Sequence, residues 1–203
     1  MPTSHEGSES VSKPPSDQTR TVTGSPQAMW KIVFLAVSTA LVFVVTRIAY
    51  VPISAFNGQV FDFGDILIFT FAWTFGPLIG GFAGGVGSFL SDASLLSPFA
   101  PFTLVIKGSE GLVAGYIARR RSAWGLRSSW LVASTVMVGG YFLTNWLALG
   151  YGFFVGLYEV PFDIMQVVAG GIIGRPVSRY LKNSLPMNIM SHKSPAAKAL
   201  SHA

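Results

Sequence analysis

The sequence has no cysteine and few charged residues. Without cysteine, the chain can form no disulfide, carries no thiol nucleophile and has no cysteine-ligated metal site. Charged residues make up 11% of the 203 residues, whereas soluble domains carry about 25%. Because a water-facing surface could hardly be built from so few charges, the composition argues against an ordinary soluble protein.

Familiar catalytic motifs are also missing. The sequence contains no GxxxxGK[ST] phosphate loop, no HExxH and no GxSxG. Its histidines, His5, His192 and His202, lie in the terminal segments, which excludes a histidine-based site within the hydrophobic part. The sequence therefore predicts neither an enzyme nor a resident metal or cofactor.

The residues that are abundant are hydrophobic ones, at 50% of the chain with a mean hydropathy of +0.51. A membrane-spanning helix needs about 20 mostly apolar residues. Such runs occupy residues 29–50, 63–91, 102–118, 130–151 and 160–181. The polar segments 1–28 and 183–203 are predicted to be disordered tails that flank a membrane domain at 29–182. We expect a multi-pass protein of the cell membrane.

The run at 63–91 decides the number of spans. It could form one kinked helix, giving five spans, or two short helices that meet at Phe75-Gly76-Pro77, giving six. With a cytoplasmic N-terminus, six spans place every Lys and Arg except Arg47 and Lys107 on the cytoplasmic side. Five spans would put the triple-arginine segment at 119–121 outside, against the positive-inside rule. The net charge of +5 therefore reflects basic residues that set the orientation in the membrane rather than a nucleic-acid-binding surface. The predicted fold is all-α, with six transmembrane helices and both termini cytoplasmic.

Small residues recur at intervals of four in the predicted third span, at Gly76, Gly80, Gly84 and Ser88. This spacing puts them on one helix face, where another backbone can approach closely. We interpret this face mainly as packing within the chain, with binding of a partner as the alternative.

Polar residues converge on the outer ends of the six predicted spans. Charged groups inside spans are costly and usually functional. We expect an outward-facing cavity with aromatic walls for a small organic ligand, closed by loops at 51–62, 93–101 and 152–158. Lys107 and Glu110 lie three residues apart, so they form either a structural ion pair or part of the ligand site. The polar residues are Arg47, Asp62, Asp65, Ser88, Ser91, Asp92, Lys107, Glu110, Asn145, Glu159, Asp163 and Gln166; the aromatic residues are Phe61, Phe63, Trp73, Phe99, Phe102, Tyr141, Trp146 and Tyr158.

Four motifs in order resemble a known family. Residues 63–66 read FGDI, 75–81 read FGPLIGG, 84–92 read GGVGSFLSD and 101–111 read PFTLVIKGSEG. Across roughly residues 30–182 the chain resembles the substrate-binding S components of energy-coupling factor (ECF) transporters, closest to the riboflavin-type group. The resemblance implies six helices, a site for a vitamin or related micronutrient near the outside, and partners comprising a transmembrane T component and two ATPase subunits.

The resemblance also suggests roles for individual residues. In the family, small residues of the first helix pack against the T component, and Ala36 and Ala40 match that AxxxA pattern. For the ligand we predict stacking on aromatic side chains and polar contacts from other residues. The stacking residues are Trp73, Phe102 and Tyr158, and the polar ones are Asp65, Lys107, Glu110, Asn145 and Glu159.

Two other classes of function remain open at the level of sequence. One is a stand-alone proton-coupled transporter or channel, in which Glu110, Glu159 or Asp163 would carry the proton. The other is a membrane scaffold that uses no cavity, which predicts that Lys107→Ala and Glu159→Ala leave function intact.

Overall fold

The computed structural model describes residues 26–49, 51–52, 60–120 and 123–185. Nearly all of this part is helical, which confirms the predicted all-α fold. A π-helical turn (η1, Thr144–Ala148) extends α5, and a short antiparallel pair joins β1 (Val51–Pro52) to β2 (Val60–Phe61). The six α-helices are α1 (Pro26–Ile48), α2 (Gly64–Phe75), α3 (Pro77–Ser94), α4 (Ala100–Ala118), α5 (Ala123–Leu143) and α6 (Phe153–Ser184).

The break between α2 and α3 lies at Gly76, as the sequence predicted. Gly76 has φ of 98°, a conformation that favours glycine because a side chain would be strained there. Pro77 follows in the first turn of α3, where its missing N–H costs no helical hydrogen bond. The hydrophobic run at 63–91 therefore forms two helices, and the six-helix prediction is correct.

The boundaries of the last two helices differ from the prediction. Helix α5 starts at Ala123 rather than at residue 130, and α6 starts at Phe153, so the loop expected at 152–158 is almost entirely helical. Glu159 therefore lies inside α6, with its side chain buried. The ends of α1 and α6 extend slightly into the predicted tails, whose other residues lie outside the described part of the chain.

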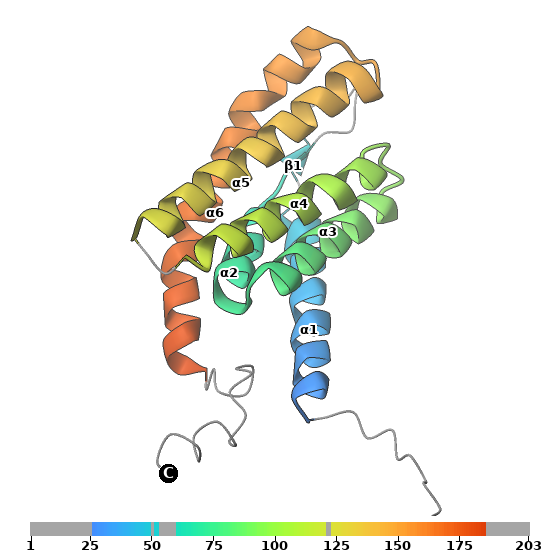
Figure 1. Cartoon of the computed structure of the whole chain (residues 1–203). Helices are drawn as coiled ribbons and strands as arrows, with labels where there is room; N and C mark the ends of the chain where they lie inside the picture. Colours follow the sequence, from blue (N-terminus) through green and yellow to red (C-terminus); the bar gives the residue numbers. More distant parts are fainter. Residues whose placement is uncertain (1–25, 50, 53–59, 121–122, 186–203) are drawn as a thin grey trace, which may run out of the picture.

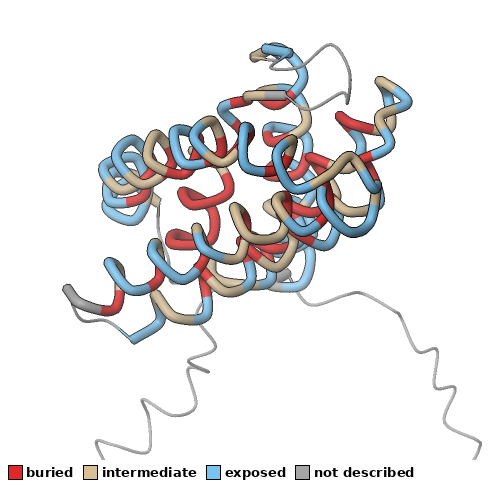
Figure 2. The backbone as a smooth tube through the Cα atoms, turned by 90° about the horizontal axis from the view of Figure 1, so that it is seen from above, coloured by how far each residue is buried: buried red, intermediate tan, exposed pale blue. Residues whose placement is uncertain are grey.

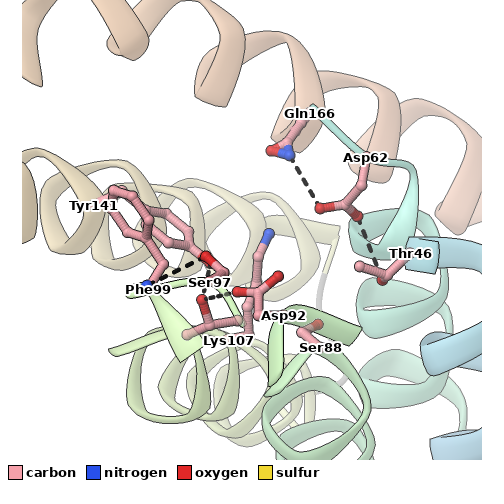
Figure 3. Close-up of a pocket in the computed structure, with 10 residues that line it drawn as sticks. Thr46, Asp62, Ser88, Asp92, Ser97, Phe99, Lys107, Tyr141 and Gln166 are labelled. Atoms are coloured by element: carbon pink, nitrogen blue, oxygen red, sulfur yellow. Dashed lines mark hydrogen bonds between the residues drawn. The ribbon is translucent and has the colours of Figure 1, made fainter. Parts of the chain in front are cut away.

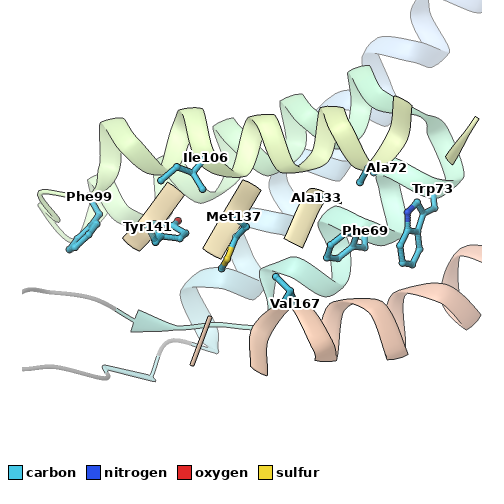
Figure 4. Close-up of a cluster of buried hydrophobic side chains, with 10 residues drawn as sticks. Phe69, Ala72, Trp73, Phe99, Ile106, Ala133, Met137, Tyr141 and Val167 are labelled. Carbon is cyan, nitrogen blue, oxygen red and sulfur yellow. The ribbon is translucent and has the colours of Figure 1, made fainter. Parts of the chain in front are cut away.

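The helices form an elongated bundle in which α3 and α4 run side by side (Figure 1). The start of α1 and the end of α6 lie on the same side of the bundle in this view. Buried residues lie on the helix faces turned inward, and exposed ones on the outer faces (Figure 2). A buried apolar cluster extends through the interior from Phe99 to Trp73 (Figure 4).

The surface is apolar where a soluble protein would be polar. Large hydrophobic side chains are exposed on α1, α3, α4, α5 and α6, including Ile32, Leu78, Val105, Leu131 and Ile172. Three helical segments are long and apolar enough to cross a bilayer, namely Ala28–Ile48, Gly125–Ala148 and Phe153–Ser184. Helix α2 is a shorter apolar helix, and most of its residues are buried by its neighbours. These features confirm a multi-pass membrane protein.

Glycines allow α3 and α4 to touch backbone to backbone, which confirms the packing interpretation of the glycine pattern. A Cβ atom added to Gly115 would lie 2.5 Å from the Cα of Pro77. One added to Gly85 would lie 2.8 Å from the carbonyl oxygen of Leu104. Contacts this close need glycine, because they leave no room for a side chain.

Gly111→Ala tests this contact. The new methyl group would collide with the backbone of Gly80, which cannot move away without separating α3 from α4. We expect a loss of about 1–3 kcal/mol of stability, measured by thermal unfolding of the purified protein in detergent. Gly139→Ala on α5 is the matched control, since nothing lies within 4 Å of the added atom. Equal stability of the two variants would contradict the proposed close packing.

Candidate substrate-binding site

A small polar cavity of about 20 Å³ lies between the helices (Figure 3). Helices α1, α3, α4, α5 and α6 and the segments preceding α2 and α4 all contribute to its wall, and most of the contributing side chains are polar. Phe99 and Tyr141, both among the predicted aromatic residues, are the aromatic members of this wall, whereas the other six predicted aromatic residues do not line it. The lining residues are Thr46, Asp62, Ser88, Asp92, Ser97, Phe99, Thr103, Lys107, Tyr141 and Gln166.

Asp62 forms one side of the cavity, just before α2 begins. Its carboxylate accepts a 2.5 Å hydrogen bond from the backbone N–H of Gly64. Its side-chain partners are more distant: the Thr46 hydroxyl is 3.5 Å from Oδ1, and the Gln166 amide is 3.4 Å from Oδ2. Hydrogen bonds at these lengths are weak. The carboxylate is therefore held by the backbone but has capacity for a stronger donor.

Asp92 of α3 forms the opposite side. It accepts a 2.5 Å hydrogen bond from the hydroxyl of Thr103 on α4. The Tyr141 hydroxyl of α5 in turn donates to Thr103 at 3.2 Å. This chain of hydrogen bonds connects three helices and fixes the position of the second carboxylate in the cavity (Figure 3).

Lys107 connects the cavity to a buried ion cluster. Its ammonium group pairs with Asp65 of α2 and lies 3.9 Å from Glu110 on its own helix. It also lies 5.7 Å from the centre of the Tyr141 ring, within range of a cation–π contact. Asp65, Lys107 and Glu110 are all at most 2% exposed, so removing the cation would leave two carboxylates in a nearly dry interior.

The structure brings together only part of the predicted site. Lys107 lines the cavity, and Asp65 and Glu110 adjoin it through Lys107. Asn145 donates a 2.6 Å hydrogen bond to Glu159, so these two residues form a separate contact between η1 and α6. Neither residue lines the cavity, and of the predicted polar contacts only Lys107 belongs to its wall.

The predicted stacking residues also lie outside the cavity wall. Phe102 packs against the apolar cluster. Trp73 lies at the end of this cluster away from Phe99 and donates a 3.0 Å hydrogen bond to Ser129 (Figure 4). Tyr158 is 58% exposed and contacts Phe162 on the surface of α6.

Three residues of the cavity were missed by the reasoning from sequence. Thr103 lies four residues before Lys107 and so shares its helix face, a signal that was available in the sequence. Thr46 was missed because the prediction named its charged neighbour Arg47 as the polar residue at the end of this helix. Ser97 belongs to the connection between α3 and α4, where no periodic pattern indicates which way a side chain points.

Comparison with known proteins assigns this arrangement to a family. Residues 27–183 match the family described as "ECF-type riboflavin transporter, S component". The chain belongs to this family. It is therefore the substrate-binding S component of an ECF transporter, and the family is one of transport subunits rather than enzymes.

The chain is also similar to individual proteins. The chain is 41% identical over 143 residues to an uncharacterized protein of Pyrococcus woesei, covering 70% of this chain and 95% of that one. It is 32% identical over 160 residues to the thiamine precursor transporter HmpT of Lactococcus lactis subsp. cremoris, covering 78% and 91% of the two chains. A solved S component of a bacterial ECF transporter superposes with a TM-score of 0.64 over 78% of this chain and 99% of that chain. At 24% identity, this last likeness concerns the fold.

Lys107→Met tests the importance of the buried cation. Methionine fills similar space but leaves Asp65 and Glu110 uncompensated, so we expect a loss of about 3–5 kcal/mol of stability. Glu110→Gln removes one of two carboxylates that share a single cation, and we expect it to cost much less. Thermal unfolding in detergent measures both, with Lys31→Met on the exposed side of α1 as control. A Lys107→Met protein as stable as the control would show that the pair is not structural.

Proposed function

We propose that this S component captures a small, water-soluble vitamin precursor that carries N–H donors. A transmembrane T component and two ATPase subunits then drive its release into the cytoplasm. The observation that carries this proposal is the small polar cavity with carboxylates on two sides. The HmpT relative, a thiamine precursor transporter, supports the same class of ligand.

The carboxylates explain why donors are expected on the ligand. Asp62 and Asp92 both accept hydrogen bonds, and those from Thr46 and Gln166 to Asp62 are long. An amino group or ring N–H of a ligand would make a shorter, charge-assisted bond in their place. Lys107 on the cavity wall would recognise an acceptor atom of the same molecule. Alternating donors and acceptors of this kind are typical of aminopyrimidine rings.

The size of the cavity implies movement on binding. A volume of about 20 Å³ holds roughly one water molecule, whereas ligand pockets measure about 300–1,000 Å³. A vitamin precursor can therefore enter only if the wall opens. We infer that the connection between α3 and α4 moves, because Ser97 and Phe99 close the cavity there while neighbouring Leu96 is 92% exposed.

The predicted polar residues act either directly on the proposed ligand or through other residues. Lys107 contacts it directly, and Asp65 and Glu110 hold the position and charge of Lys107. Asn145 and Glu159 hold η1 against α6 near the cavity. Trp73 and Tyr158 receive no role in ligand contact.

A groove on α1 is the proposed surface for the T component. Ala36 and Ala40 line an apolar hollow of about 410 Å³ together with Phe43 of α1 and Phe82 and Leu90 of α3. Alanines four residues apart leave the helix surface shallow, so another transmembrane helix can approach closely. The groove thus has the shape and polarity that a T-component helix requires.

Both termini are proposed to be cytoplasmic. Helix α4 ends beside Arg119 and Arg120, and α6 carries Arg175, Arg179 and Lys182 near its end. Basic residues next to membrane helices favour the cytoplasmic side. The cavity, formed by the opposite ends of these helices, then faces outward.

Ligand binding without ATP is the first expected result. Isothermal titration of the purified chain with the pyrimidine and thiazole precursors of thiamine, thiamine, riboflavin and pyridoxine should identify one compound with sub-micromolar affinity. Asp62→Asn and Asp92→Asn should each weaken its binding by about 10–100-fold, since each removes a charged acceptor. Tyr158→Phe, on the exposed surface of α6, is the control and should bind normally.

Two outcomes would overturn the proposal. One is the absence of binding by a folded protein to any compound of the panel. The other is uptake that follows a pH gradient into liposomes that contain this chain alone. Such uptake would support a proton-coupled transporter instead.

The groove on α1 gives a separate prediction. Ala36→Leu and Ala40→Leu should prevent co-purification with the T component, because larger side chains hold the partner helix away. Both variants should still bind ligand, since neither residue lines the cavity. Val37→Leu, on the same helix but outside the groove, should assemble normally. Assembly by both alanine variants would place the interface elsewhere.

A further inference from the structure

Acidic side chains outnumber basic ones in the interior of the bundle. All six Asp and Glu residues in the described part of the chain are buried. Among the Lys and Arg residues of the same part, Lys107 is the only one that is buried. The interior around the substrate cavity is therefore poor in positive charge. The buried acidic residues are Asp62, Asp65, Asp92, Glu110, Glu159 and Asp163.

The positive charge of Lys107 is already shared within the ion cluster. Its ammonium group pairs with Asp65 and lies 3.9 Å from Glu110. Asp62 and Asp92 are two further carboxylates, and they line the cavity from opposite sides (Figure 3). The cavity and the cluster together thus hold four carboxylates beside one ammonium group.

Neutral groups hold the two cavity carboxylates in place. The donors to Asp62 are a backbone N–H, a hydroxyl and a side-chain amide, and the donor to Asp92 is the Thr103 hydroxyl. Such donors orient a carboxylate but bring no positive charge to it. Residues 53–59, which precede Asp62 and lie outside the described residues, contain no Lys, Arg or His. In the described part of the chain, Lys107 is the only basic side chain that lines the cavity, so a cation bound there would meet two carboxylates.

The aromatic side chains of the wall suit an organic cation better than a metal ion. The ring centres of Phe99 and Tyr141 lie 6.4 Å apart, and aromatic rings attract ammonium groups. The Lys107 ammonium, 5.7 Å from the centre of the Tyr141 ring, already uses this attraction. Divalent metal ions need about six oxygen ligands, whereas the described residues contain no group of three His, Cys, Asp or Glu side chains placed to hold a metal. Carboxylates and rings together therefore favour an amine on a ring compound.

We propose that the ligand is an organic cation whose ammonium group binds between Asp62 and Asp92. Its ring then packs against Phe99 and Tyr141. This inference rests on the proposed function, because it assigns a charge to the ligand of the same cavity. A primary ammonium group has three donors, enough to serve both carboxylates at once. Lys107 binds an acceptor atom elsewhere on the molecule, and the carboxylates of the ion cluster limit its repulsion of the ligand.

The test compares compounds of the same shape that differ in charge. The pyrimidine precursor of thiamine carries a neutral hydroxymethyl group, whereas its aminomethyl analogue carries an ammonium group at neutral pH. Pyridoxine and pyridoxamine form a second pair of this kind. Isothermal titration of the purified full-length chain should show the cationic member of at least one pair binding about 10–100-fold more tightly, because a charge-assisted hydrogen bond replaces a neutral one.

Carboxylate variants test where the charge is read. Asp62→Asn and Asp92→Asn should each reduce the preference for the cation to a few-fold. The preference is a ratio of two affinities measured on the same variant, so a partly unfolded sample does not change it. Asp163→Asn is the matched control, since it removes a buried carboxylate that does not line the cavity, and it should keep the preference.

A second control concerns the basic residues at the two ends of the chain, which lie outside the described residues. A full-length variant in which these residues are changed to Gln should show the same preference as the original protein. A preference that appears only in this variant would show that the chain's own basic residues occupy the carboxylates, and it would overturn the inference. The residues changed are Lys13, Arg20, Lys193 and Lys198.

The outcomes separate this inference from the proposed function. Equal or tighter binding of the neutral member in both pairs would overturn the inference, and so would binding of neutral riboflavin in preference to every cation. In both cases the proposed capture of a ligand would stand. A folded protein that binds no compound at all would instead overturn the proposed function itself.

Discussion

The buried charge of Lys107 is the constraint on which much of the structure depends. An ammonium group inside a membrane protein is costly unless carboxylates compensate it. Here Asp65 of α2 and Glu110 of α4 lie beside it, so the ion cluster holds two helices in a fixed relation. The same side chain reaches the wall of the substrate cavity. Stability of the bundle and polarity of the site are therefore properties of one arrangement and cannot be changed independently.

Close helix packing makes this arrangement possible. In a bilayer, the apolar surface of a helix gains little by leaving lipid, so helices associate through shape and polar contacts. The glycines between α3 and α4 bring the backbones together, and Asp92 then reaches Thr103 across the interface. Tyr141 extends the same network to α5. The cavity is thus a consequence of the close packing that the glycines allow between α3 and α4.

The two ends of the bundle have opposite electrostatic character. Carboxylates gather at the substrate cavity, where they suit a ligand with donors. Arg119, Arg120, Arg127, Arg175 and Arg179 lie toward the other end, near the end of α4, the start of α5 and the second half of α6. In the proposed function, the carboxylates serve ligand recognition and the arginines favour the cytoplasmic side.

The sequence by itself determined the number of helices and the family. Gly76-Pro77 and the arginine-rich segment after α4 were sufficient for the helix count, because local backbone limits and the cost of charge in lipid act through nearby residues. Only the tertiary structure decided which polar residues share a cavity. Trp73 and Tyr158 have suitable chemistry but lie elsewhere, whereas Thr46 and Ser97 enter the wall through helix rotation and loop direction. Helix rotation and loop direction depend on contacts between residues far apart in the chain, which hydrophobic periodicity and spacing do not encode.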